Sequence, residues 1–210
     1  MVVTWAPVKA FFQVLFLLSL MAVPTRAATG CDLNTPARDV PRLFPESTSY
    51  KSRYVSLRPD QLTSVVARLG ESFRVLYDPL DVPYTIYEIY TGGEKVGYIH
   101  GVNQKGQFGG IQVFVALDMS GRIKSFYIQK MTGQSAGRFR DAGFGRQFLG
   151  LSLKDFDSFD VVSGKGSGRL ARIRNPDPEM ETDFYGVLRA LKKNLIVMDE
   201  LVYSTKRQNP

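Results

Sequence analysis

Two periodic patterns of hydrophobic and polar positions occur along this chain, one typical of helices and the other of strands. Residues 59–69 repeat apolar side chains at three- and four-residue spacing, which predicts a helix whose buried face is made by Leu62, Val65, Val66 and Leu69. From residue 84 onward, short runs rich in β-branched and aromatic residues predict strands at 84–90, 95–102, 110–117 and 122–129.

Turn sequences join these consecutive runs. Thr91-Gly92-Gly93-Glu94 and residues 118–121 suit tight hairpins, and residues 103–109 are expected to form a longer connection. A second helical pattern at 184–203 predicts a C-terminal helix that packs on the sheet, and residues 138–149 predict a shorter helix. The expected fold class is therefore α+β, with a twisted antiparallel sheet and helices packed on one face.

The first 30 residues have the pattern of a secretory signal peptide. Lys9 precedes an almost wholly apolar run at 10–23, which is shorter than the roughly 20 residues that a membrane-spanning helix needs. Two alternatives stay open. Residues 28–31 resemble a bacterial lipobox, which makes Cys31 a candidate for lipidation, and the leader could also remain as an anchor. We expect an exported protein, periplasmic or attached to the membrane.

Beyond the leader, the pattern predicts one domain. Residues 31–41 are polar and contain prolines, so we expect a linker there. Residues 42–54 show no regular rhythm and form the irregular start of a domain over 42–205, which leaves 206–210 as a C-terminal tail. No internal repeat is visible.

The amino-acid composition excludes some classes of function for this protein. Cys31 is the only cysteine in the sequence, so an internal disulfide and a Cys-based metal cluster are excluded, and any redox chemistry needs a bound cofactor. The net charge of +7 comes from dispersed basic residues, which favours acidic partners or a membrane surface over nucleic acid. His100, the only histidine, is assigned no role, and the acidic residues between 177 and 183 are interpreted as a solvated loop. No triad or carboxylate pair supports hydrolysis.

The segment 160–168 is the part of the sequence whose residue types indicate a binding function most specifically. It reads Asp-Val-Val-Ser-Gly-Lys-Gly-Ser-Gly behind a strand-like run at 159–162. Glycines let backbone N–H groups approach an anion closely, so we expect an anion-binding turn. Candidate ligands of a phosphate are the N–H groups of this turn, two hydroxyls and two cations, contributed by Ser163, Gly164, Lys165, Gly166, Ser167, Gly168 and Arg169.

The order of several short motifs resembles the FMN-binding domain of the Rnf and Nqr membrane electron-transfer complexes. The motifs are Leu43-Phe44-Pro45-Glu46, Gly97-Tyr98, Gly109-Gly110-Ile111, Gly121-Arg122-Ile123 and Phe148-Leu149-Gly150, followed by the glycine-rich segment. The resemblance covers roughly residues 40–205. It implies an electron-transfer protein with FMN near Ser163 and near a loop at 132–134, where Thr132 and Gly133 keep part of the family's flavin-side sequence.

The same resemblance shows where this chain departs from the family. Family members carry FMN through a phosphoester to the threonine of a Ser-Gly-Ala-Thr motif. Here Ser163 and Gly164 match, whereas Lys165 replaces the alanine and Gly166 replaces the threonine. Because glycine has no hydroxyl, covalent attachment at this position is chemically impossible. Ser167 is the one nearby alternative acceptor.

Two functions therefore follow from the sequence. The first is an exported flavoprotein that binds FMN noncovalently and relays electrons at the membrane surface, to or from a membrane redox complex or a periplasmic electron carrier. The alternative is a flavin-free relative that serves as an assembly or interaction subunit of such a complex.

Overall fold

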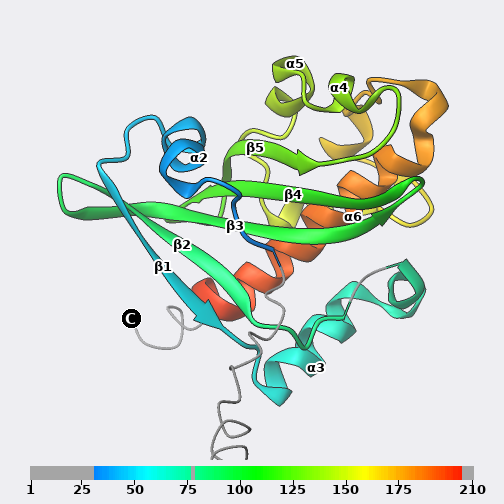
Figure 1. Cartoon of the computed structure of the whole chain (residues 1–210). Coiled ribbons are helices and arrows are strands. Elements are labelled where there is room, and N and C mark those ends of the chain that lie inside the picture. The colour runs from blue at the N-terminus through cyan, green and yellow to red at the C-terminus, as the bar shows by residue number, and fades with distance from the viewer. Residues whose placement is uncertain (1–30, 77–78, 205–210) are drawn as a thin grey trace, which may run out of the picture.

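The computed structural model describes residues 31–76 and 79–204, so the predicted signal peptide and C-terminal tail lie outside the described residues. At its centre is a five-stranded antiparallel sheet in which neighbours in space are also neighbours in sequence. Figure 1 shows the sheet with its helices around it. The strands are β1 (Ser49–Val55), β2 (Tyr84–Thr91), β3 (Glu94–Gly106), β4 (Gly109–Asp118) and β5 (Ile123–Lys130).

One face of the sheet forms the main hydrophobic core with α6 (Glu181–Met198) and α3 (Pro59–Leu69). Buried strand residues such as Ile86, Val113 and Val115 belong to the same apolar cluster as Val187 and Leu191 of α6. Figure 1 shows α6 running across this side of the sheet, continued by a short π-helical segment at Asp199–Tyr203. The prediction of an α+β fold with a C-terminal helix on the sheet is confirmed.

The opposite face of the sheet is covered by a segment that the sequence analysis missed. Residues 31–41 were predicted to be a linker, and this was wrong, because Cys31, Leu33 and Val40 are buried there and α2 (Pro36–Leu43) begins within it. These residues join Ile89 and Phe114 in a second apolar cluster. The domain therefore begins before residue 42.

Two further local predictions need correction. Residues 49–55 are not irregular: they form β1, which pairs antiparallel with β2. Residues 103–109 are not a long loop, because β3 and β4 continue until Gly106 pairs with Gly109. The predicted helix at 59–69 and the predicted strands between 84 and 130 agree with the structure to within a few residues.

The predicted helix over 138–149 is divided into α4 (Ala136–Phe139) and α5 (Ala142–Arg146). The break has a local cause, since the Asp141 carboxylate accepts a hydrogen bond from the N–H of Gly143 at 2.6 Å and so begins a new helix. These two short helices, here called the α4–α5 lobe, bury Phe139 and Phe144 against the main core, and Phe148, just after α5, is buried with them.

The chain between the lobe and α6 is built from short elements. They are 3₁₀ helices at Leu153–Phe156, Leu170–Arg172 and Pro178–Met180, and a small hairpin of β6 (Phe159–Asp160) and β7 (Lys165–Gly166); a further 3₁₀ helix at Glu71–Leu76 follows α3. Within the described residues, no helix combines the length and the apolar character that crossing a membrane requires.

Candidate functional site

The glycine-rich segment forms a β-hairpin, here called the glycine hairpin, which comprises residues 159–168. Phe159 pairs with Gly166 and Asp160 with Lys165. The N–H of Gly164 donates to the carbonyl of Asp160 at 2.8 Å, and the N–H of Ser167 donates to the carbonyl of Ser158 at 2.9 Å. Two of the N–H groups expected to bind a phosphate are thus used inside the hairpin.

The carboxylate of Asp160 occupies the inside of the turn. It accepts the hydroxyl of Ser163 at 2.6 Å and the N–H of Val162 at 2.8 Å. These hydrogen bonds, the Ser163 hydroxyl first, lower the pKa of Asp160, so the carboxylate is ionised in neutral solution. One of the donors expected to bind a phosphate, the hydroxyl of Ser163, is therefore already bound to a carboxylate of the protein itself.

Steric contacts fix the backbone of the glycine hairpin. A Cβ at Gly166 would lie 2.3 Å from the carbonyl oxygen of Ser158, and the φ angle of +146° is one that side-chain-bearing residues rarely adopt. A Cβ at Gly164 would lie 2.4 Å from the hydroxyl oxygen of Tyr185 on α6. The position that corresponds to the acceptor threonine has no room for a side chain in this conformation.

The two predicted cations of the turn differ in their surroundings. Lys165 is exposed, and its ammonium group has no hydrogen bond or ion pair among the described residues. Arg169 is used structurally, because its guanidinium donates to the carbonyls of Leu149 at 2.8 Å and Gly150 at 3.0 Å. Arg169 ties the end of the glycine hairpin to the chain that follows the α4–α5 lobe.

A buried arginine on α6, Arg189, contacts the turn of the glycine hairpin just after β6 and was missed by the sequence analysis. It is 7% exposed, and its guanidinium donates to the carbonyls of Val161 and Thr182, both at 3.4 Å. Burial lowers its pKa. Within residues 31–76 and 79–204, no carboxylate forms an ion pair with it, so its contribution is to anchor backbone carbonyls.

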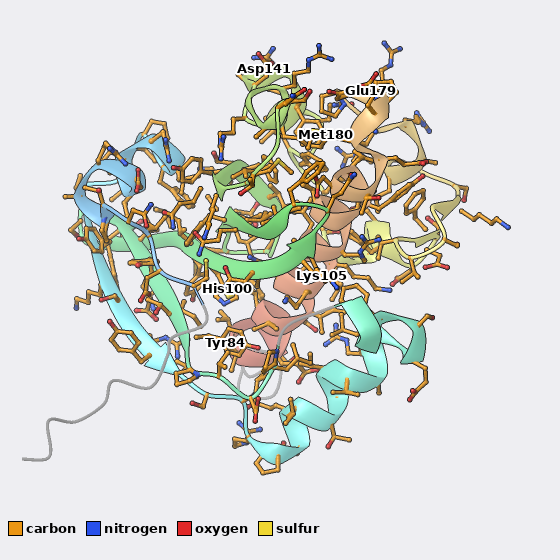
Figure 2. The ribbon with its side chains drawn as sticks, turned by 45° about the vertical axis from the view of Figure 1, so that its right-hand side comes forward. Tyr84, His100, Lys105, Asp141, Glu179 and Met180 are labelled. Atoms are coloured by element: carbon orange, nitrogen blue, oxygen red, sulfur yellow. The ribbon has the colours of Figure 1, made fainter. Side chains whose placement is uncertain are left out.

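The second predicted part of the site, Thr132 and Gly133, lies in the loop after β5. Thr132 is exposed. A Cβ at Gly133 would lie 2.9 Å from the terminal methyl of Met180 and 3.3 Å from the ring of Phe108, which is 55% exposed at the tip between β3 and β4. Figure 2 shows Met180 just before α6. The start of α6 therefore lies against both predicted parts of the site, with Met180 beside Gly133 and Tyr185 beside Gly164.

Three other residues considered in the sequence analysis, Cys31, His100 and Asp183, are buried in the structure. Cys31 is buried, which raises the pKa of its thiol to about 12, and lipidation there would require the residue to leave its packing. His100 is wholly buried beside Tyr84, as Figure 2 shows, and burial lowers its pKa to about 4. Asp183 is buried and accepts the N–H of Gln107, so the prediction that this acidic segment is a solvated loop was wrong for this residue.

The acidic residues between 177 and 183 do not assemble a metal site. Asp177 accepts the N–H of Glu179 at 3.1 Å and begins the short 3₁₀ helix there. Across the described part of the chain, no group of three or more His, Cys, Asp or Glu side chains is placed to hold a metal ion. Sequence reasoning passed over the role of Asp160 in closing its turn, although an aspartate three residues ahead of a serine in a turn signals this closure.

Comparison with known proteins identifies a shared fold. No protein-family model matches the sequence, and no curated protein sequence matches it. Among solved structures, the crystal structure of NqrC from Shewanella oneidensis is similar, with a TM-score of 0.54 and 14% sequence identity, over 84% of this chain and 90% of that chain. The likeness extends over nearly the whole domain and establishes a common fold.

Proposed function

We propose that this protein is an exported accessory subunit of a membrane redox assembly, which keeps the fold shared with NqrC and works without flavin at the glycine hairpin. The fold likeness and the motif order support an origin among FMN-binding domains. One observation carries the flavin-free part of the proposal. The turn that should receive a phosphate is closed around the carboxylate of Asp160.

The donor chemistry of the hairpin does not fit a phosphoester-linked FMN. Gly166 offers no hydroxyl and no space for one, and the hydroxyl of Ser163 is donated to Asp160. Adding a phosphate dianion next to an ionised carboxylate in this turn would cost free energy through like-charge repulsion. The role left to the domain is to bind a partner through its surface.

The test is to express the full chain with its leader and record the visible spectrum and the intact mass of the purified protein. We expect no flavin absorbance and a mass equal to that of the polypeptide, both before and after incubation with FMN and the flavin transferase. Flavin that stays with the protein after denaturation and filtration would overturn the proposal; the added mass would establish a covalent linkage, and peptide mapping would locate it at a residue such as Ser167.

A second candidate function is electron relay by noncovalently bound FMN. The observation that favours it is the exposed ring of Phe108 beside Gly133, with Thr132 exposed in the same loop. There Phe108 and the 132–134 loop would contact the isoalloxazine ring, and Lys165 would attract the phosphate from outside the turn. Bound FMN would supply one- and two-electron redox chemistry.

Titration of the purified protein with FMN, followed by flavin fluorescence, separates the two candidates. Unchanged fluorescence supports the flavin-free role. Saturable quenching that Phe108→Ala and Lys165→Ala weaken would support the relay. Tyr54→Ala serves as the matched control, since Tyr54 is also a strongly exposed aromatic residue but lies on β1.

A further inference from the structure

A basic cleft lies on the edge strand β5, and none of its lining residues belongs to the glycine hairpin. It measures about 500 Å³ and opens between α2, β5 and the α4–α5 lobe. Figure 2 shows Asp141, one of its lining residues, on the outer side of this lobe. Its size falls within the range of ligand sites in proteins, roughly 300–1,000 Å³.

The charged side chains of the cleft are strongly unbalanced. Asp141 is the only carboxylate among its lining residues, whereas four cations line it, namely Arg42, Lys124, Arg140 and Arg146. The carboxylate of Asp141 also accepts the N–H of Gly143, which directs it into the helix start. The net charge of the cleft is therefore positive.

Two of the four cations have carboxylate partners. Lys124 pairs with Glu46, and its hydrogen bond lowers the pKa of that carboxyl. Arg42 pairs with buried Asp39 at 3.2 Å, although Asp39 is shared with Arg38, and one carboxylate cannot neutralise two guanidinium groups.

The other two cations have no carboxylate partner in the part of the chain that the structure describes. Arg140 donates to the backbone carbonyls of Ile128 and Met131, which leaves its charge uncompensated. Arg146 is exposed and forms no ion pair within the described residues. Neither charge is neutralised by a carboxylate among these residues, and the donors left for an anion in the cleft are Nη1 of Arg140 and the whole guanidinium of Arg146.

The floor of the cleft is apolar and aromatic. Phe126, Phe139 and Leu149 line it, and Leu149 is 40% exposed. The guanidinium of Arg42 lies over the ring of Tyr127, 3.5 Å from its centroid, so this cation is held flat against an aromatic surface. Cations beside an apolar floor suit a ligand that carries an anionic group on an apolar body.

We propose that this cleft binds a small organic anion, with its phosphate or carboxylate group on Arg140 and Arg146 and its apolar body on Phe126 and Leu149. The site lies outside the glycine hairpin and does not depend on the proposed function. Two kinds of ligand carry such an anionic group, namely a soluble metabolite and an anionic lipid with its headgroup. The experiment below distinguishes between them.

Calorimetric titration with phenyl phosphate tests the proposal, because this probe combines a dianion with an apolar ring. We expect saturable binding that Arg146→Gln weakens about tenfold or more, since a charge-assisted hydrogen bond contributes about 1.5–3 kcal/mol. Arg172→Gln is the matched control. It removes the same charge from an exposed arginine outside the cleft and is expected to leave the affinity within about twofold.

A second variant separates the two halves of the site. Leu149→Ala removes apolar floor and is expected to weaken phenyl phosphate several-fold while leaving the binding of inorganic phosphate unchanged. The proposal is overturned if phenyl phosphate does not bind at millimolar concentration, or if Arg146→Gln and Arg172→Gln reduce binding equally. Circular dichroism of each variant checks that its fold is intact.

Cosedimentation with phosphatidylglycerol vesicles distinguishes the sources of the anion. Vesicle binding that requires Arg146 and is displaced by phenyl phosphate assigns the cleft to a lipid headgroup. Phenyl phosphate binding without Arg146-dependent vesicle binding assigns it to a soluble anion. Vesicle binding that Arg146→Gln and Arg172→Gln weaken alike, with no phenyl phosphate binding, indicates general surface charge and refutes the site.

Discussion

The glycine hairpin and the basic cleft are two regions suited by composition to anions, and they differ in whether an anion is built in. In the hairpin, Asp160 supplies a carboxylate to the donors of its own turn. In the cleft, Asp141 is the only lining carboxylate, and within the described residues it forms no ion pair with Arg140 or Arg146. The contrast teaches that the number of donors does not define a binding site, because only donors left unsatisfied by the fold are available to a ligand.

The strongest test of the closed hairpin is the substitution Gly166→Thr. A side chain there meets the Ser158 carbonyl and an unfavourable φ, so we expect a loss of about 3 kcal/mol in unfolding free energy. Gly110→Thr is the control, because a Cβ at Gly110 meets nothing within 4 Å. Urea denaturation measures both variants. A fully stable Gly166→Thr protein would show that the hairpin can open, which weakens the contrast.

The core and the hairpin are expected to affect the stability of the protein over different ranges of pH. His100 has a folded pKa of about 4 and an ordinary value near 6.5, so the unfolded chain binds the extra proton between these values. Stability is therefore full above pH 6.5 and falls by up to about 3 kcal/mol as the pH drops to 4. Denaturation midpoints across this range measure the loss.

The control for this pH effect is His100→Phe, which keeps a ring in the core and should flatten the profile above pH 4. If that variant does not fold, proton NMR of the His100 ring in the wild type replaces it. A ring that titrates near pH 6.5 contradicts the assignment. Variants of the hairpin or the cleft are expected to leave this part of the profile unchanged.

A smaller effect is expected from Asp160→Ala, which opens the turn. Stability should fall by about 1 kcal/mol at neutral pH, since two hydrogen bonds to an exposed carboxylate are lost. Because the folded pKa of Asp160 is lowered, its contribution is present above the unfolded value near 3.9 and is lost as the pH falls through the folded value. The wild type should therefore show this loss only below about pH 4.

The same variant also tests whether the turn can bind phosphate once its own carboxylate is removed. With the carboxylate gone, the hydroxyl of Ser163 and the N–H of Val162 become available, and phosphate binding to the turn is expected to appear in a calorimetric titration. Asp157→Ala removes an exposed carboxylate close by and is expected to produce no such gain. Equal phosphate binding in both variants would mean that net charge alone controls it.

The smallest effect concerns Arg169, which links the hairpin to Leu149 on the cleft. Arg169→Ala removes two hydrogen bonds at a half-exposed site, so we expect a loss of less than about 1 kcal/mol, together with faster amide exchange near residues 149–151. Lys165→Ala should change neither quantity. Unchanged exchange in Arg169→Ala would show that the two regions are independent.

Sequence reasoning recovered the elements that bury one face against a single core. Strands β2 to β5 and helices α3 and α6 carry clear periodic patterns, so their apolar residues reveal them. Strand β1 was missed because it is an exposed edge strand with little apolar alternation, and α2 was missed because Pro36 and Pro41 suggested a linker.

The candidate sites were harder to predict than the elements. The glycine-rich segment was found, but its closure depends on the carboxylate of Asp160 turning back onto Ser163. The cleft draws its lining from α2, β5 and the α4–α5 lobe, which are far apart in sequence. No local pattern brings Arg42, Arg140 and Arg146 together, because only the tertiary packing does so.

The order of strands in the sheet has a consequence for how the chain folds. Every strand pairs with its sequence neighbour, and three of the four pairings close through short connections, so the sheet can form early from local contacts. Its core face, however, is covered by α6, which comes last in the described chain. We expect a stage in which Val113, Val115 and neighbouring residues remain exposed, so that the docking of α6 decides between folding and aggregation.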